Sequence, residues 1–292
     1  MARRLSRLSR WFLLFILAVS MWGCADAGFI IKNMEPIMDE LNVSMNKSSD
    51  VEMLRDAMPA GLVQLDGFIE AAPNTKLLIR TSEAYFGYTF AFVEETNKQR
   101  ASMLYLKARD YALDVLLQER YFRENFNKGI DEFTGSLDEF GKKDVPALYW
   151  AANNWMAWIA LNLNNPEVLL DIPKVEAMLL RAVDLNENYY YGGAHATLGA
   201  FYASRAKAIG GNPEKAKYHF QRAFKLSRSK VLFIHLLYAQ YYAYQVQDRD
   251  LFVKTLEGIV ATPVGYFPEK NFANEIAKRK AQKLLEDVDM YF

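Results

Sequence analysis

The spacing of apolar and polar residues predicts helices along most of this chain. From residue 49 onward, apolar side chains recur three and four positions apart, and no stretch alternates convincingly with the two-residue period of a strand. Glycine and proline fall mostly at the boundaries between the apolar segments. Asparagine followed by proline marks two helix starts, at Asn165-Pro166 and Asn212-Pro213. We therefore expect an all-α protein whose folded body begins at residue 49.

Two segments of the chain repeat each other. They are RAVDLNENYYYGGA, beginning at Arg181, and RAFKLSRSKVLFIH, beginning at Arg222. Between them, the small Gly199 and the large Tyr202 and Phe220 occupy the places that tetratricopeptide repeats (TPRs) give to such residues. A small residue lets two helices cross closely, and the rings fill the adjoining gaps. Because one helix pair buries only part of its apolar surface, pairs of this kind must stack.

The resulting architecture is an α-solenoid of about four degenerate TPR-like helix pairs with a C-terminal capping helix. One unit lies between Ala182 and Ala223, and the cap is expected near residues 272–288. The other pairs are expected at residues 75–95 with 99–122, residues 145–163 with 173–184, and residues 230–247 with 249–261. Together these elements form one helical repeat domain over residues 49–292.

The N-terminus has the pattern of an export signal. Four arginines precede an apolar run at residues 11–21, which is too short to span the hydrocarbon of a bilayer. Cys24, the single cysteine, follows directly, as in the lipobox of bacterial lipoproteins, where the signal is cleaved and the cysteine is acylated. The alternative is an ordinary signal peptide with an incidental cysteine. We predict a lipoprotein signal at residues 1–23 and a tether at residues 24–48, with room for one short helix.

Charge and motifs exclude several classes of function. Removal of the signal leaves 31 basic and 35 acidic residues, a net charge of −4, so nothing attracts nucleic acid. The histidines, His195, His219 and His235, do not have zinc-site spacing. The chain also lacks a nucleophile elbow and a phosphate-binding loop. We therefore expect a binding protein without a catalytic site, metal or cofactor.

The first helix of each predicted pair is rich in aromatic residues. EAYFGYTFAFVEE, ALYWAANNWMAWIALN and HLLYAQYYAYQ carry rings on all sides of the helix rather than along one stripe. For any single ring, a place in the core is the simpler interpretation, but tyrosine hydroxyls need polar partners. As a group these residues suit an aromatic-lined cleft for a peptide, a partner loop or an apolar ligand. The candidates for the lining are Tyr85, Tyr88, Phe92, Trp150, Asn154, Trp158, Tyr202 and Tyr241.

Taken together, the lipobox, the repeats and the aromatic helices make the chain resemble the TatT family. These proteins are the periplasmic lipoprotein T components associated with tripartite ATP-independent periplasmic (TRAP) transporters. The similar stretches are DAMPAGLVQLDGFIEAAPNTKLL, EAYFGYTFAFVEE, LYLKARDYALDVL and the repeats through RAFKLSRS. They span about residues 49–263.

The resemblance implies a function as well as a fold. It implies a TPR-like protomer that assembles as a homotrimer, with a cleft or pore through each protomer. The implied partner is the soluble substrate-binding P component. The implied ligands are small molecules, which include hydrophobic organic acids and lipids. Transport chemistry would belong to a separate permease, and the protein would sit in the periplasm on its lipid anchor. Ala25 rather than aspartate follows the cysteine, which is consistent with the outer membrane.

A second function fits the same sequence features. A TPR-like lipoprotein can scaffold outer-membrane or secretion machinery by binding extended peptides in its groove. The identity of the stably bound partner separates the two alternatives. An enzyme is the least favoured class, because no acid, base and nucleophile stand in a recognisable pattern.

Overall fold

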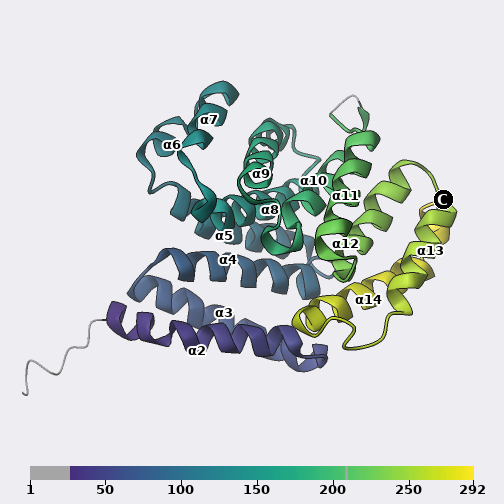
Figure 1. The fold of residues 1–292 in the computed structure, drawn as a ribbon, viewed down its shortest axis with the longest axis horizontal. Helices are drawn as coiled ribbons and strands as arrows, with labels where there is room; N and C mark the ends of the chain where they lie inside the picture. Colours follow the sequence, from purple (N-terminus) through teal and green to yellow (C-terminus); the bar gives the residue numbers. More distant parts are fainter. Residues whose placement is uncertain (1–26, 208–209) are drawn as a thin grey trace, which may run out of the picture.

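The computed structural model describes residues 27–207 and 210–292, and the regular structure in these residues is helical. The expected all-α solenoid is confirmed (Figure 1). The predicted signal and Cys24 lie outside the described residues. The longer helices are α2 (Ala27–Lys47), α3 (Val51–Ala71), α4 (Thr75–Tyr88), α5 (Lys98–Leu116), α8 (Val145–Leu161), α9 (Ile172–Asn186), α10 (Gly193–Ala203), α11 (Pro213–Ser227), α13 (Arg249–Val260) and α14 (Asn271–Glu286).

Shorter helical segments connect these helices. Two of them are wide π-helical turns, η1 (Thr89–Val93) after α4 and η7 (Tyr238–Ala243) after α12 (Leu232–Leu237). The other segments are α6 (Arg120–Asn125), α7 (Ile130–Ser136), η2 (Leu137–Glu139), η3 (Lys142–Asp144), η4 (Pro166–Asp171), η5 (Tyr189–Tyr191), η8 (Pro268–Lys270) and η9 (Val288–Met290).

Side-chain caps set the starts of several helices. Asn74, Asn97, Asn212 and Asp248 each accept a hydrogen bond of 2.9 Å from the backbone amide three residues later. Such a cap satisfies one of the four amides that the first turn of a helix leaves unpaired. Three of these caps start the second helix of a pair, α5, α11 or α13, and so fix where each turn between paired helices ends.

The helix pairs stack as the repeat pattern predicts. Helices α4 and α5, α8 and α9, and α10 and α11 pack against each other, and α13 packs on η7 and on the capping helix α14. Gly199 of α10 sits against the ring of Phe220 of α11, which is fully buried. Gly199 and Phe220 therefore form the close helix contact that the repeat pattern predicts.

Substituting Gly199 by alanine is expected to lower the free energy of unfolding by about 1–3 kcal/mol. A Cβ atom at this position would lie 2.8 Å from the Phe220 ring, which is inside van der Waals contact. Gly67→Ala in α3 is the matched control, because a Cβ there meets nothing within 4 Å. The control should be neutral or stabilising by up to about 1 kcal/mol, because alanine favours helix over glycine. Urea unfolding followed by circular dichroism measures both variants, and equal effects would contradict the packing.

The segment expected to be a tether is mostly helix in the structure. Helix α2 spans Ala27–Lys47 and buries Ile31 and Met38 in a small cluster with Leu77 of α4. Asp39 also pairs with Lys76 (2.6 Å between Nζ and Oδ2) and with Arg80. The seven-residue spacing of Ile31 and Met38 places both on one helix face, so α2 can bury them against the repeat body. Within the described residues, the helical body therefore includes residues 27–47, ahead of the expected start at residue 49.

The solenoid curls until its two ends meet. Helix α14 packs against α2 and α3, and in Figure 1 it meets the right-hand end of α2. Asn271 donates a hydrogen bond to the carbonyl of Lys47 (3.2 Å), and Lys280 pairs with Glu95 at 2.6 Å. This closure places the first and last helices on opposite sides of one internal space. None of the helices in the described ranges is long and apolar enough to cross a membrane.

Candidate functional site

The space enclosed by this closure is a cavity of about 330 Å³. Helices α2, α3 and α4 and the turn η1 line one side, and η5, α12, η8 and α14 line the other. A cavity of this size is at the lower end of the range that holds small organic ligands in proteins. Because α2 forms one wall and α12 and α14 form the other, the cavity depends on the contact between the two ends of the solenoid.

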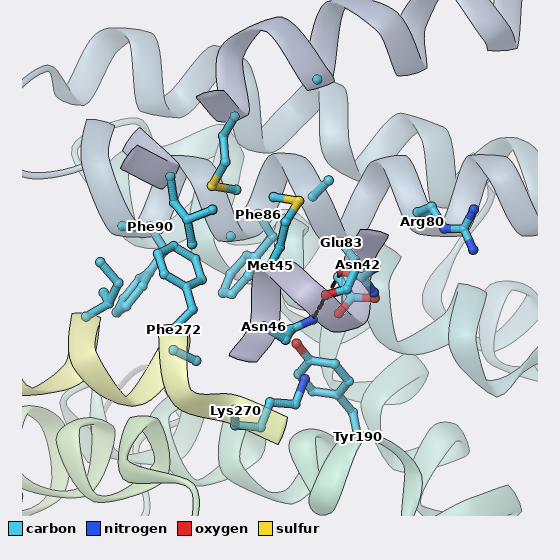
Figure 2. A pocket seen from close by; sticks show the side chains of 18 of the residues that line it. Asn42, Met45, Asn46, Arg80, Glu83, Phe86, Phe90, Tyr190, Lys270 and Phe272 are labelled. Carbon is cyan, nitrogen blue, oxygen red and sulfur yellow. Dashed lines mark hydrogen bonds between the residues drawn. The ribbon is translucent and has the colours of Figure 1, made fainter. Parts of the chain in front are cut away.

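Aromatic and aliphatic side chains form most of the cavity wall. Phe86 and Phe90 come from α4 and η1, and Phe233 and Phe272 approach from α12 and α14. The rings of Phe90 and Phe233 meet edge to face with their centroids 4.9 Å apart. Figure 2 shows Phe86, Phe90 and Phe272 gathered with Met45 at one end of the cavity. This end suits an apolar chain or ring.

Polar side chains gather at the opposite end. Asn42 and Asn46 of α2, Glu83 of α4, Tyr190 and Lys270 lie close together in Figure 2. The two asparagines bond to each other, with 3.1 Å between the Asn46 Nδ2 and Asn42 Oδ1 atoms. The cavity is therefore apolar at one end and polar at the other. Its charged lining residues are Glu83, Lys270 and Arg80, and Arg80 is paired with Asp39.

Lys270 is the unusual member of this group. Its side chain is only 8% exposed, and within the described ranges no carboxylate lies within 4.0 Å of its Nζ atom. The Nζ atom lies instead over the ring of Tyr190, 4.1 Å from its centroid. Burial lowers the pKa of Lys270, and the more distant charge of Glu83 opposes that shift. A buried ammonium group that lies over aromatic faces retains hydrogen-bonding capacity for an anion.

A strained loop holds Tyr190 in the cavity wall. Tyr190 and Tyr191 have φ angles of 49° and 59°, in the left-handed region that residues other than glycine seldom occupy, and Gly192 follows with φ 79°. Gly193 then begins α10 against Tyr149, whose hydroxyl would lie 2.7 Å from a Cβ atom at position 193. Left-handed residues cost about 1–2 kcal/mol each, and such strain is concentrated at functional sites. The local cost supports a binding role for this end of the cavity.

The comparison with known families agrees with this architecture. The model of the TRAP transporter T-component family matches residues 47–292. The chain belongs to this family. The resemblance seen in the sequence is therefore confirmed, and the protein is an accessory component of a TRAP transporter. No match was found among curated proteins.

The aromatic residues that we predicted to line a cleft lie elsewhere in this T-component. None of the eight lines the large cavity. Phe92 borders a second, smaller hollow of about 260 Å³ beside α14. Phe92, Trp158 and Tyr241 are half-buried, and the remaining five are buried in the core, namely Tyr85, Tyr88, Trp150, Asn154 and Tyr202.

Internal polar partners explain why these side chains do not need a groove. The Tyr85 hydroxyl donates to Asp66 at 2.7 Å, and the Tyr202 hydroxyl donates to Glu176. Asn154 donates to the Ser82 hydroxyl at 3.1 Å. A buried tyrosine requires such a partner, and neighbouring helices of the T-component supply it. The Tyr85 and Tyr202 hydroxyls and the Asn154 amide nitrogen therefore have their partners within the fold.

One of the predicted aromatic helices, α4, lines part of this cavity, but through residues other than the predicted ones. Phe86 and Phe90, which line the cavity, lie in the same stretch as Tyr85 and Tyr88. The polar end was missed, and the available signal was the run of three tyrosines before Gly192-Gly193. Lys270 had no local signal, since it is one lysine in a charged stretch near the C-terminus.

Two of the three histidines form a buried pair away from the cavity. The Nδ1 atoms of His195 and His219 lie 2.9 Å apart, between α10 and α11. Glu187 contacts His195 at 3.3 Å and pairs with Arg222. No group of three or more metal-ligating side chains occurs in the described part of the T-component. The contact between two imidazoles requires at least one neutral ring to accept the hydrogen bond.

This histidine pair predicts a loss of stability in mild acid. Burial, with the charges of His195 and Lys215, lowers the pKa of His219 to about 4, well below its value in an unfolded chain. Stability is therefore complete above about pH 6.5 and decreases as the pH falls toward 4, because only the unfolded chain binds the proton. The expected loss at pH 4 is about 3 kcal/mol from this residue.

His219→Gln provides the test, because glutamine can still bond to His195 but does not titrate. Thermal melts of both proteins between pH 7.5 and pH 5 should show a steeper decline for the wild type. If the two proteins decline in parallel, His219 is not a source of the acid sensitivity.

Proposed function

We propose that this chain is a periplasmic T component, anchored by an acylated Cys24, that binds the substrate-binding P component and holds a small ligand in its cavity. The observation that carries the proposal is the buried Lys270 at the polar end of a cavity whose other end is apolar. Family membership supports the link to a TRAP transporter. The signal pattern ahead of Cys24 supports export and anchoring. Assembly as a homotrimer is the expectation that follows from the resemblance to TatT proteins.

The cavity favours an apolar ligand with one acid group. Its phenylalanine-rich end suits an alkyl chain or ring, and the Lys270 ammonium suits a carboxylate or a comparable anion. Glu83 shares the polar end, and Arg80, the second cation of the lining, is already paired with Asp39, so a second negative charge on the ligand would be repelled there. A monoacid with an apolar body matches these walls better than a small, highly charged dicarboxylate.

Isolation of the anchored protein from its host tests the partner assignment. After crosslinking and detergent extraction, the T component should recover a periplasmic solute-binding protein. The Cys24→Ser variant provides the control for the anchor, since it should leave the membrane fraction. Recovery of outer-membrane channel or secretion proteins alone would favour the alternative function, a scaffold that binds extended peptides.

A further inference from the structure

The outward face of α2 carries a row of exposed apolar side chains. Phe29 is 65% exposed, Ile37 is 60% exposed and Leu41 is 58% exposed, and Ile30 is also exposed. Residues 30, 37 and 41 are spaced by seven and four positions, so they lie along one side of the helix. The exposed charged residues of α2 are Lys32, Glu40 and Lys47. Isolated exposed apolar residues are ordinary, but an aligned row indicates an interaction surface.

The position of this row along the chain indicates what covers it. Helix α2 begins at Ala27, three residue steps after Cys24. Three steps of extended chain reach at most about 11 Å. If Cys24 carries acyl chains, the first turn of α2 must lie within that distance of the lipid headgroups. Phe29 and Ile30, exposed at this end, are then the first side chains to reach the bilayer surface.

We infer that α2 lies against the membrane and seats its row of Phe29, Ile30, Ile37 and Leu41 in the headgroup region. Apolar side chains of surface helices insert to this depth, while charged residues remain at the boundary with water. Lys32, two positions after Ile30, lies on the opposite side of the helix from Ile30 and Ile37, so its charge stays in water. The folded protein therefore lies directly on the bilayer and is not separated from it by a flexible linker. This inference rests on the proposed acylation of Cys24.

Membrane contact through α2 would also place the cavity at the bilayer surface. Leu41 belongs both to the exposed row and to the cavity lining, and Met38, Asn42, Met45 and Asn46 of the same helix line the cavity as well. The apolar face and the cavity wall are thus two sides of one helix. An apolar ligand could pass between the lipid and the cavity with little exposure to water.

Fluorescent labels at single introduced cysteines test this inference. In the acylated protein the Cys24 thiol is occupied, so Ile30→Cys and Ile37→Cys variants each offer one site for an NBD fluorophore. Leu170→Cys is the matched control, because Leu170 is 76% exposed and precedes α9, which α4 and α5 separate from α2 in Figure 1. On vesicles of phosphatidylethanolamine and phosphatidylglycerol, the two α2 labels should gain intensity and shift to the blue.

The control label should keep the emission of a fluorophore in water. If the α2 labels also emit as in water on vesicles, the inference is overturned. A second result would also overturn the inference: the α2 labels are already shielded from water in the non-acylated Cys24→Ser protein, and that protein elutes as an oligomer. In that case a second copy of the chain covers α2. Mass spectrometry of the N-terminal peptide separately establishes acylation. A lipidated protein with water-exposed α2 labels would refute the contact with the membrane and leave the proposed anchor intact.

Discussion

Replacing Trp150 with alanine is expected to lower the free energy of unfolding by about 3–5 kcal/mol. Trp150 of α8 is fully buried, and its ring packs on Phe86 and Tyr190 with centroid distances of 5.7 Å and 4.9 Å. Its indole nitrogen donates to the Tyr189 hydroxyl at 3.2 Å. The substitution removes the largest fully buried side chain of the described core and leaves a void behind two residues of the cavity wall.

Urea unfolding followed by circular dichroism measures this effect. Leu170→Ala is the control, and because Leu170 is exposed it should change stability by no more than about 0.5 kcal/mol. The result also decides between two interpretations of Trp150. A stable variant that loses ligand binding would restore Trp150 to the site predicted from sequence, whereas a destabilised variant places it in the supporting core.

Replacing Lys270 with methionine is expected to weaken binding of an apolar monoacid roughly ten- to hundredfold. Decanoate is a suitable probe, because its carboxylate can meet the Lys270 ammonium while its chain lies among Phe86, Phe90 and Phe272. Hydrogen bonds to charged groups contribute about 1.5–3 kcal/mol, more than those between neutral groups. Methionine preserves most of the length and the apolar contacts of the lysine stem, so the variant removes mainly the charge.

Calorimetric titration with decanoate and with decanol separates the charge from the cavity. The alcohol has the same chain without the negative charge, so its affinity should change little in Lys270→Met. Lys254→Met removes an exposed cation of α13 and should leave both affinities unchanged. Equal losses for decanoate and decanol would mean that the cavity itself had collapsed. An unchanged decanoate affinity would remove Lys270 from the proposed site.

Much of the fold is predictable from local sequence. Helix caps such as those at Asn74 and Asn212 involve residues three positions apart. The contact of Gly199 with Phe220 lies within one helix pair. Because these interactions are close in sequence, the residue pattern reveals them. Helix α2 was only partly predicted. Its buried residues Ile31 and Met38 stabilise a helix only because α4 supplies Leu77 as their partner.

The candidate site was less predictable, because the apolar period of a helix does not distinguish the face that packs in the core from the face that lines a cavity. Tyr85 and Phe86 are neighbours, yet the hydroxyl of Tyr85 binds Asp66 in the core while the Phe86 ring faces the cavity. The π-helical turn after α4 further changes the direction of Phe90 relative to a regular 3.6-residue period. Aromatic composition therefore identified the helix but not its lining residues.

The sequence by itself determined that this protein is a stack of paired helices, and it predicts an export signal followed by an acylated cysteine. These properties depend on local spacing and on residues close together in the chain. The tertiary structure alone decided that α14 returns to α2 and α3, that Lys270 lies over the ring of Tyr190, and that Glu83 lines the same cavity. That arrangement sums small rotations over every helix pair of the solenoid, and no local pattern of residues encodes the sum.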